Sequence, residues 1–317
     1  MKSAKNHSIL FYNVENLYDI HDDPKVSDTE FTPHGDKKWN LERYHRKLHA
    51  LSKILLNASN NHPIIAGFTE VENRGVVEDL ILKTQLSEFH YSIIHQNSPD
   101  NRGIDLCLIY DKDYVKRIGH EFLRINFPWN KDIKTRDVLF FRCQINDENF
   151  LIVVNHWPSR RDGAEETEDK RLHVAAAVRA KIEEYQLNFP SDKTLIMGDF
   201  NDEPQNKSIE RILKSKRSKN IKQDEFYNLM TEADKNEKGT SSHMGEWLMI
   251  DQMMINRNFL QNNNDGLGVK SQKAKIYSGN DVLYCRANGN CQPSQTYGGD
   301  YYLGGVSDHL PVLIELD

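Results

Sequence analysis

Residues 195–202 read LIMGDFND, and this stretch says most about the fold. Three apolar residues run into a glycine, which predicts a buried strand that ends in a tight backbone turn. Asp199 and Asn201 then stand on either side of Phe200, whose ring we expect to be anchored in the core. A carboxylate and an amide placed in this way can share one phosphate or one metal-bound water. The stretch therefore predicts a strand of an α/β protein with polar groups at its carboxyl end, where such folds place their ligands.

Three other apolar runs in the chain also end in polar side chains. The first is followed by Asn13 and Glu15, the second by Glu70, and the third by His156. Each segment taken alone is also typical of a solvated strand end. However, glutamate is rarely buried unless it is paired or bound to a metal ion, and an imidazole close to an arginine such as Arg160 suits an anion. These residues are therefore candidates for one polar site built from several strand ends.

Two further segments point to a carboxylate–histidine pair. Asp251 lies within the apolar run at residues 249–255, where an unpaired charge would be costly. Asp308 and His309 shortly precede the apolar run at residues 312–316. A histidine is the natural partner for a buried carboxylate, so we expect Asp251 to orient His309 and to fix its tautomer. Oxygen ligands without cysteine favour a hard cation, Mg²⁺ or else Mn²⁺, over Zn²⁺.

Hydrophobic spacing predicts an α/β protein in which strands dominate. We expect helices at residues 40–58, 75–87 and 166–188, and strands at residues 8–13, 63–69, 91–95, 105–110, 138–145, 150–155, 193–197, 249–256 and 311–316. Neither the basic segment at residues 214–222 nor the turn-rich segment at residues 261–268 separates two self-sufficient halves. We therefore expect residues 1–317 to form one domain of two packed sheets with helices outside.

Composition and charge limit the class of protein. The chain has 317 residues, of which 38% are hydrophobic and 28% charged, as in ordinary globular proteins. A net charge of −6 opposes tight non-specific binding to DNA, although a local basic groove remains compatible with it. No apolar run is long enough to span a membrane, and we expect no signal peptide because no leader-like apolar run follows Met1. A cytoplasmic monomer is therefore the default expectation, with a trimmed exported protein as the alternative.

The four cysteines match no zinc or redox motif. Cys107 and Cys143 lie in apolar runs, which predicts that both are small buried residues. Cys285 and Cys291 flank a Gly-Asn loop, where a disulfide is an alternative. Since disulfides are rare in the cytoplasm, we expect these two thiols to be free.

Six short segments together resemble the endonuclease/exonuclease/phosphatase superfamily, whose fold is DNase I-like. They read FYNVEN, GFTEVEN, NHWPSR, GDFND, MIDQ and SDHLP, follow the order of that family, and reach from Asn13 in the first segment to Pro311 in the last. The phrases RGIDLCLIYD, GEWLMIDQMMIN and YLGGVSDHLPV are most similar to a bacterial subgroup. The resemblance covers nearly the whole chain. It implies a four-layer α/β/β/α sandwich with one active site at the top of the two sheets.

The resemblance also implies roles for the candidate residues. The metal-binding carboxylates would be Glu70, Glu15 and Asp308. The catalytic groups would be His309, Asp251, Asp199, Asn201 and His156. The substrate contacts would come from Asn13 and from one or two of Arg102, Arg136, Arg160 and Arg171. In the loops GTSSHMGEW and PSQTYGG, Ser, His and Gln stand where similar proteins carry Lys or Arg, which argues against substrate contacts from these loops.

The activity that the resemblance implies is Mg²⁺-dependent hydrolysis of a phosphate ester, most directly a phosphodiester. A water polarised by Asp199 or His309 would attack in line. A nucleic acid is one substrate class, and a small-molecule or lipid-headgroup phosphatase or phosphodiesterase is the alternative. A non-catalytic binding module is a distant third reading, because all the acidic and imidazole positions are present. The motifs describe the phosphate and not the group attached to it.

Overall fold

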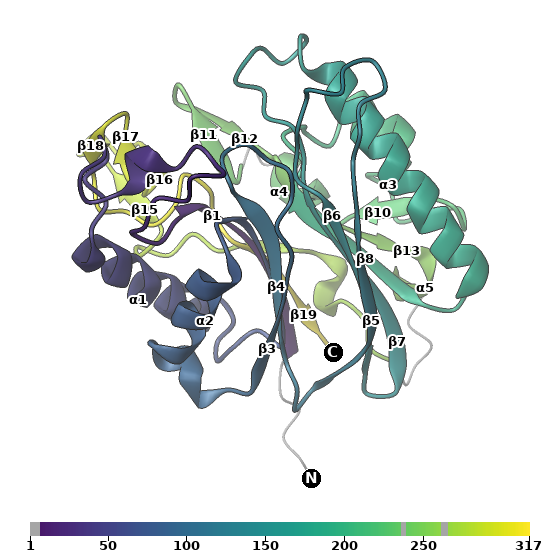
Figure 1. Ribbon diagram of the computed structural model, residues 1–317. Coiled ribbons are helices and arrows are strands. Elements are labelled where there is room, and N and C mark those ends of the chain that lie inside the picture. Colours follow the sequence, from purple (N-terminus) through teal and green to yellow (C-terminus); the bar gives the residue numbers. More distant parts are fainter. Residues whose placement is uncertain (1–6, 236–238, 261–265) are drawn as a thin grey trace.

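The computed structural model describes residues 7–235, 239–260 and 266–317. Two β-sheets pack face to face in the centre, and helices cover both outer faces (Figure 1). This is the four-layer α/β/β/α sandwich that the resemblance implied. Continuous buried runs along the central strands explain it, because each sheet has one face toward its partner sheet and one face toward helices.

The first sheet contains six strands in the described part of the chain. In spatial order they are β14 (Lys275–Ile276), β19 (Val312–Leu316), β1 (His7–Leu17), β2 (Ile65–Val71), β4 (Asp105–Asp111) and β3 (Tyr91–His95). β1 and β2 are parallel, whereas the other neighbours are antiparallel. The carboxyl ends of β1 and β2 therefore meet at one edge of the sandwich, and these ends carry the predicted polar residues.

The second sheet contains seven strands over the same described residues. Their spatial order is β5 (Val115–Leu123), β6 (Val138–Ile145), β7 (Glu148–His156), β8 (Lys193–Asp199), β13 (Asp251–Asn256), β10 (Phe226–Asn228) and β9 (Ser215–Lys216). β7 and β8 are parallel and end side by side. The two sheets approach closely at Gly67 of β2, where an added Cβ would lie 2.7 Å from the Met197 side chain of β8.

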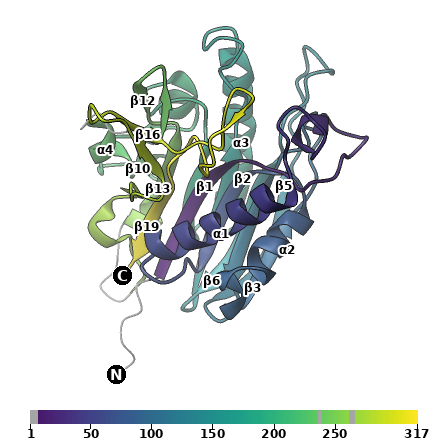
Figure 2. The same cartoon turned by 90° about the vertical axis from the view of Figure 1, so that its left-hand side faces the viewer.

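Helices α1 (Leu41–Ala58) and α2 (Arg74–Leu82) cover the first sheet, and α3 (Glu168–Asn188) covers the second (Figures 1 and 2). Asn40 caps the start of α1, because its side chain accepts a hydrogen bond from the Arg43 amide. The remaining short helical elements are η1 (Thr29–Phe31), η2 (Gln85–Glu88), η3 (Ser208–Ile212), α4 (Thr231–Lys235), α5 (Arg257–Leu260) and η4 (Lys270–Gln272). No helix of the described residues is both long and apolar enough to cross a membrane.

Three short hairpins lie at the end of the sandwich where β1, β2, β7 and β8 finish (Figure 1). They are β11 (Ser241–His243) with β12 (Glu246–Leu248), β15 (Leu283–Cys285) with β16 (Cys291–Pro293), and β17 (Tyr297–Gly298) with β18 (Tyr301–Tyr302). Hydrophobic spacing did not predict them, because they are short and largely solvent-exposed. β5 was missed as well, since its side chains are mostly exposed or half-buried. Residues 261–265 of the predicted turn-rich segment lie outside the described residues.

The expectation that Cys285 and Cys291 are free thiols is wrong. The two residues form a disulfide, and they are directly opposite each other in the β15–β16 hairpin. This register brings the sulfur atoms together whatever the compartment, a constraint that composition cannot reveal. Cys107 and Cys143 are buried and free, as predicted.

Candidate active site

The centre of the site is formed by three adjacent strand ends of the second sheet. His156 of β7 is in register with Asp199 of β8, and Asp251 of β13 pairs with Asp199 from the other side. All three side chains are buried. Gly198 makes this spacing feasible, because an added Cβ there would lie 2.3 Å from the Asn155 carbonyl oxygen. The glycine in GDFND is thus required by close packing of β8 against β7.

His309 and Asp251 form the predicted pair. His309 Nδ1 lies 2.7 Å from Asp251 Oδ2, and both side chains are buried. The His309 backbone amide donates to Ser307 Oγ at 3.0 Å, which fixes the loop that carries the imidazole. The Nδ1 contact leaves Nε2 directed toward Asp199, whose Oδ2 is 3.9 Å away. The imidazole is therefore oriented by one carboxylate and presents its second nitrogen to the site.

Asn13 joins the two sheets at this point. Its Nδ2 donates to Asp199 Oδ2 at 3.1 Å and lies 3.5 Å from His309 Nε2. Ser307 Oγ in turn donates to the Asn13 carbonyl oxygen at 2.6 Å. Residues that are almost 300 positions apart in the chain are thereby held in one network, as the predicted single site requires.

Glu70 reaches the site through an irregularity in β2. Its φ is +65°, and the pairing of β2 with β4 is interrupted between Thr69 and Val71. Such a bulge redirects a side chain that regular alternation would place elsewhere. One Glu70 oxygen accepts from the Asn16 amide at 2.9 Å, and the other lies 3.9 Å from His156 Nε2.

These groups face a cavity of about 910 Å³ at the end of the sandwich. Glu70, His156, Asp199, Asn201, Asp308 and His309 all line it. The Asp308 side chain is half-exposed there, and one of its oxygens lies 3.9 Å from His309 Nε2. Asn201 is held by its Nδ2, which donates to the Trp157 carbonyl oxygen at 3.1 Å. The Phe200 ring is fully buried against Trp157, as predicted.

Glu15 is placed differently from the other carboxylates. Its side chain accepts hydrogen bonds from the backbone amides of Thr296 at 2.7 Å and Tyr297 at 3.4 Å, and it does not line the cavity. The buried Lys47 ammonium donates to the Glu15 carbonyl oxygen and to Thr296 Oγ1. Burial, with the charge of Asp308, raises the pKa of Glu15 to about 8. The geometry therefore indicates that Glu15 anchors the loop at Thr296.

The four candidate arginines separate into two kinds. Arg102 and Arg160 line the cavity along with Arg136, but Arg136 is buried and donates to Asp100 and to the Trp157 carbonyl oxygen. Arg171 is 1% exposed, pairs with Asp202 at 2.7 Å, and donates to Thr167 and Ala164. The expectation that Arg171 contacts substrate is therefore wrong, because its guanidinium is used inside the fold.

Two lysines in the cavity wall were not predicted from the sequence. Lys134 and Lys170 both line the cavity. Lys134 lies in an irregular segment and Lys170 near the start of α3, where neither spacing nor a motif distinguishes a functional lysine from a solvated one. His243 was not expected to contribute either, yet it also lines the cavity.

The charges in the site are set by burial and by close neighbours. Burial, with the charges of Arg136 and Arg102, holds the pKa of His156 well below its usual value, so this imidazole is neutral. For His309, burial is outweighed by Asp251, Asp308 and Asp199, and its pKa lies well above the usual value. Burial raises the pKa of Asp199 to about 7, although His309 opposes the shift. The site thus pairs a cationic with a neutral histidine.

The donor set fits a divalent cation. Asp199, Asp251 and His309 offer ligand atoms within 4.8 Å of one another. Among the described residues, they are the cluster of acidic and histidine side chains that lies close enough together to hold a metal ion. Because Asp251 is already bonded to His309, the cavity-facing carboxylates Glu70 and Asp308 are the more available donors. Carboxylate oxygens of this type suit a hard cation.

A buried, oriented histidine, several carboxylates and a two-sheet sandwich define the class of protein as a phosphoesterase of DNase I-like fold. Residues 8–317 match the family described as "Endonuclease/Exonuclease/phosphatase family", and the chain belongs to that family. It is accordingly a hydrolase that acts on phosphate esters. No curated protein matches the sequence.

Solved structures share the fold at low sequence identity. A humanized D. rerio TDP2 is 13% identical with a TM-score of 0.59, and the match covers 99% of this chain and 100% of that one. The human Nocturnin catalytic domain, solved with a bound sulfate anion, is 13% identical with a TM-score of 0.59, over 100% and 96% of the two chains. An endonuclease/exonuclease/phosphatase family protein from Bacteroides thetaiotaomicron is 15% identical with a TM-score of 0.59, over 98% and 97%.

Proposed function

We propose that the protein hydrolyses a phosphodiester in a reaction that depends on Mg²⁺, or alternatively on Mn²⁺. One observation supports this proposal above all. The His309–Asp251 pair, Asp199 and Glu70 come together at one cavity. A positioned acid and base next to metal-binding carboxylates is the equipment that metal-assisted attack of water requires.

In the proposed reaction, the chain's own residues position and transfer protons. Asp199 accepts the proton of the attacking water, since a pKa of about 7 suits a base at neutral pH. His309, kept protonated by Asp251, donates a proton to the departing oxygen. Neutral His156 and the Asn201 amide are the hydrogen-bond partners of the phosphate oxygens, along with Asn13.

Glu70 and Asp308 would hold the cation. When bound, the cation would neutralise negative charge on the phosphate oxygens. Glu15 does not belong to this pair in our proposal, because both of its oxygens face backbone amides of the Thr296 loop. We assign it a positioning role. Arg102 and Arg160 are the proposed arginine contacts to substrate, because they line the cavity with partly exposed side chains.

We further propose that residues 1–317 act as one domain and as a monomer. We also propose a cytoplasmic location, as expected from the sequence. An oxidising compartment is the alternative, and the Cys285–Cys291 disulfide favours that alternative.

A metal-dependent activity screen tests the proposed substrate class. Plasmid DNA, abasic DNA, RNA, a bis-aryl phosphodiester, inositol phosphates and sphingomyelin are offered side by side with Mg²⁺ and with a chelator. We expect Mg²⁺-dependent turnover of diesters and little turnover of inositol phosphates, which are monoesters. Turnover confined to monoesters would favour the small-molecule phosphatase instead.

A further inference from the structure

A second groove opens next to the candidate active site. It has a volume of about 1000 Å³ and shares Ser242, His243 and Asp308 with the active-site cavity, so the two spaces adjoin. We call it the hairpin groove, because its walls are the β11–β12 and β15–β16 hairpins. Residues 242–245 and Trp247 form one wall, and residues 289–293 with Arg286 and Gln295 form the other.

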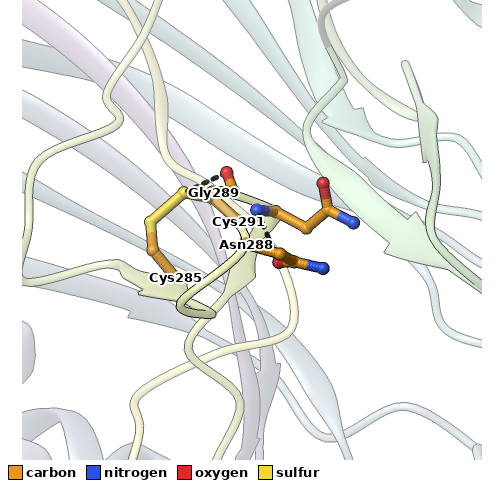
Figure 3. Close-up of a disulfide and its surroundings, with 5 residues drawn as sticks. Cys285, Asn288, Gly289 and Cys291 are labelled. Carbon is orange, nitrogen blue, oxygen red and sulfur yellow. Dashed lines mark hydrogen bonds between the residues drawn. A yellow bond between two sulfur atoms is a disulfide. The ribbon is translucent and has the colours of Figure 1, made fainter.

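The outer wall is held in shape by covalent and hydrogen bonds. The Cys285–Cys291 disulfide closes the base of the loop at residues 286–290 (Figure 3). Within that loop the Arg286 amide donates to the Asn290 carbonyl oxygen at 2.9 Å, and the Asn290 amide donates to Asn288 Oδ1 at 3.1 Å. Gly289 takes a φ of +85°, which a residue with a side chain would adopt only with strain. The loop is therefore a defined surface.

The lining chemistry selects one kind of ligand. Most of the lining side chains are polar, and among them His243, Arg286, Asn290, Gln292 and Gln295 offer hydrogen bonds. The indole of Trp247 adds one flat apolar surface, which is backed by the core. An acyl chain would need a mainly apolar lining. Amides and a guanidinium around an aromatic ring are instead the partners of a planar group with hydrogen-bonding edges.

We propose that the hairpin groove binds a nucleoside that is esterified to the scissile phosphate. This proposal rests on the proposed phosphodiesterase function and adds the substrate class to it. Asp308 lines both spaces, so a phosphate held in the active-site cavity would place one of its two ester groups at the entrance of the groove. The sequence argued against substrate contacts from these loops because it lacks the expected lysines and arginines, but a nucleobase is bound by stacking and amides.

The net charge of −6 agrees with this class of ligand. A protein that follows a long nucleic-acid backbone relies on many cations, whereas the hairpin groove offers one arginine, Arg286, among its lining residues. Recognition here would therefore depend on the base and not on a tract of phosphates. A short nucleotide ester or a strand end fits this arrangement.

The test compares two diesters with the same leaving group. Thymidine 4-nitrophenyl phosphate, as the 5′ and the 3′ ester, is compared with methyl 4-nitrophenyl phosphate by the ratio of kcat/KM values. For at least one isomer, we expect Trp247→Ala to lower this ratio by about tenfold, as loss of one stacking surface does. Arg286→Ala, at an exposed position that cannot disturb the core, should lower it as well.

The control is Trp129→Ala, because Trp129 is an exposed tryptophan that packs against Phe127 and His173 outside the groove, whereas Trp247 is half-buried in the groove wall. The ratio of this control should equal that of the wild type. Unchanged ratios in both Trp247→Ala and Arg286→Ala, for both isomers, would overturn the proposal. Absence of metal-dependent turnover of all three diesters by the wild type would instead overturn the proposed function itself.

The disulfide supplies an independent test of the same groove. Cys285→Ser combined with Cys291→Ser removes the covalent closure, so the ratio for the nucleoside ester should fall. Dithiothreitol should lower the ratio in the wild type and have no effect in the double variant, since the remaining cysteines are buried and already reduced. A double variant with the wild-type ratio would show that the loop at residues 286–290 does not contact the nucleoside.

Discussion

At the scale of single residues, the site depends on one buried ion pair. Asp251 has no access to solvent and its closest charged partner is His309, whose Nδ1 is 2.7 Å away. Removing Asp251 leaves His309 Nδ1 without its hydrogen-bond partner, and removing His309 leaves the buried Asp251 without its closest charged partner, which is costly. The same pair fixes which imidazole nitrogen faces Asp199. Activity and local stability are therefore linked at this position.

His309→Ala should lower kcat by about two to four orders of magnitude, the range for a positioned acid or base. Asp251→Asn should lower kcat as well, because an amide does not hold the imidazolium form. Steady-state kinetics on a bis-aryl phosphodiester measures both. Wild-type kcat in His309→Ala, with the fold intact by circular dichroism, would remove His309 from the mechanism.

Glu70→Gln should raise the Mg²⁺ concentration needed for half-maximal activity, because it removes one negative ligand from the proposed cation site. The matched control is Glu72→Gln, since Glu72 is a buried neighbour that accepts a hydrogen bond from the Asp19 amide and does not line the cavity. A metal titration of activity separates the two variants. If both titrate like the wild type, Glu70 is not a ligand.

Residue identity predicted much of the site but not every role. The Asp251–His309 pair followed from the cost of burying a carboxylate in an apolar run, and the structure contains it. Glu15 and Arg171 look like site residues in sequence because they are charged and close to site motifs. Their side chains instead bond to Thr296 and Asp202, and those partners depend on long-range packing that no local pattern records.

At the scale of elements, β3 and β4 contain a buried acid outside the site. Asp105 of β4 accepts from the Ser98 amide at 2.8 Å and lies 3.7 Å from His95 of β3. Burial raises the pKa of Asp105 to about 7. The folded protein therefore holds this proton more tightly than the unfolded chain does. The stability that it contributes is fully present below pH 4 and is lost as the pH rises to about 7.

Asp105→Asn should accordingly stabilise the protein at pH 8 relative to the wild type, by at most about 4 kcal/mol, and should have little effect near pH 4. The amide oxygen can still accept from Ser98. Urea unfolding at both pH values measures the difference in stability. His95 is present in both proteins, so its own titration affects both sides of the comparison. A variant that is no more stable than the wild type at pH 8 would show that Asp105 is not a strained carboxyl group.

The long elements were predictable and the short ones were not. Helix α1 follows from its apolar spacing, and β8 follows from the run before Gly198. The β11–β12 and β15–β16 hairpins lack a buried face of their own, so hydrophobic spacing gives them no signal. The groove between them was therefore beyond sequence reasoning, whereas the disulfide that closes one of them was considered from the sequence but not expected.

At the scale of the whole molecule, both sheets contribute to one site. Asn13 and Glu70 come from the first sheet, and His156, Asp199 and Asp251 come from the second. Each sheet carries only part of the machinery, so the site exists only when the sandwich is assembled. Of the six motifs, MIDQ and SDHLP lead into the antiparallel strands β13 and β19, which begin at the same edge where the strands that carry the other motifs end.

Mg²⁺ should stabilise the folded protein, because the cavity brings carboxylates together and a cation bound to them binds only the native state. At a metal concentration of 100 times Kd the expected gain is about 2.7 kcal/mol. A thermal melt with Mg²⁺ and with EDTA should therefore show a Tm higher by several degrees with metal. Glu70→Gln should reduce this difference. An equal Tm in both conditions would count against a cation site.

The most direct test of the account is the rate of bis(4-nitrophenyl) phosphate hydrolysis by the wild-type protein with Mg²⁺, after EDTA, and after Mg²⁺ is restored. We predict turnover with Mg²⁺, loss of turnover with the chelator, and recovery when the metal returns. The His309→Ala variant measured in parallel excludes a contaminating enzyme. Turnover that persists in EDTA, or that is equal in His309→Ala, would contradict a metal-dependent phosphodiesterase at this site.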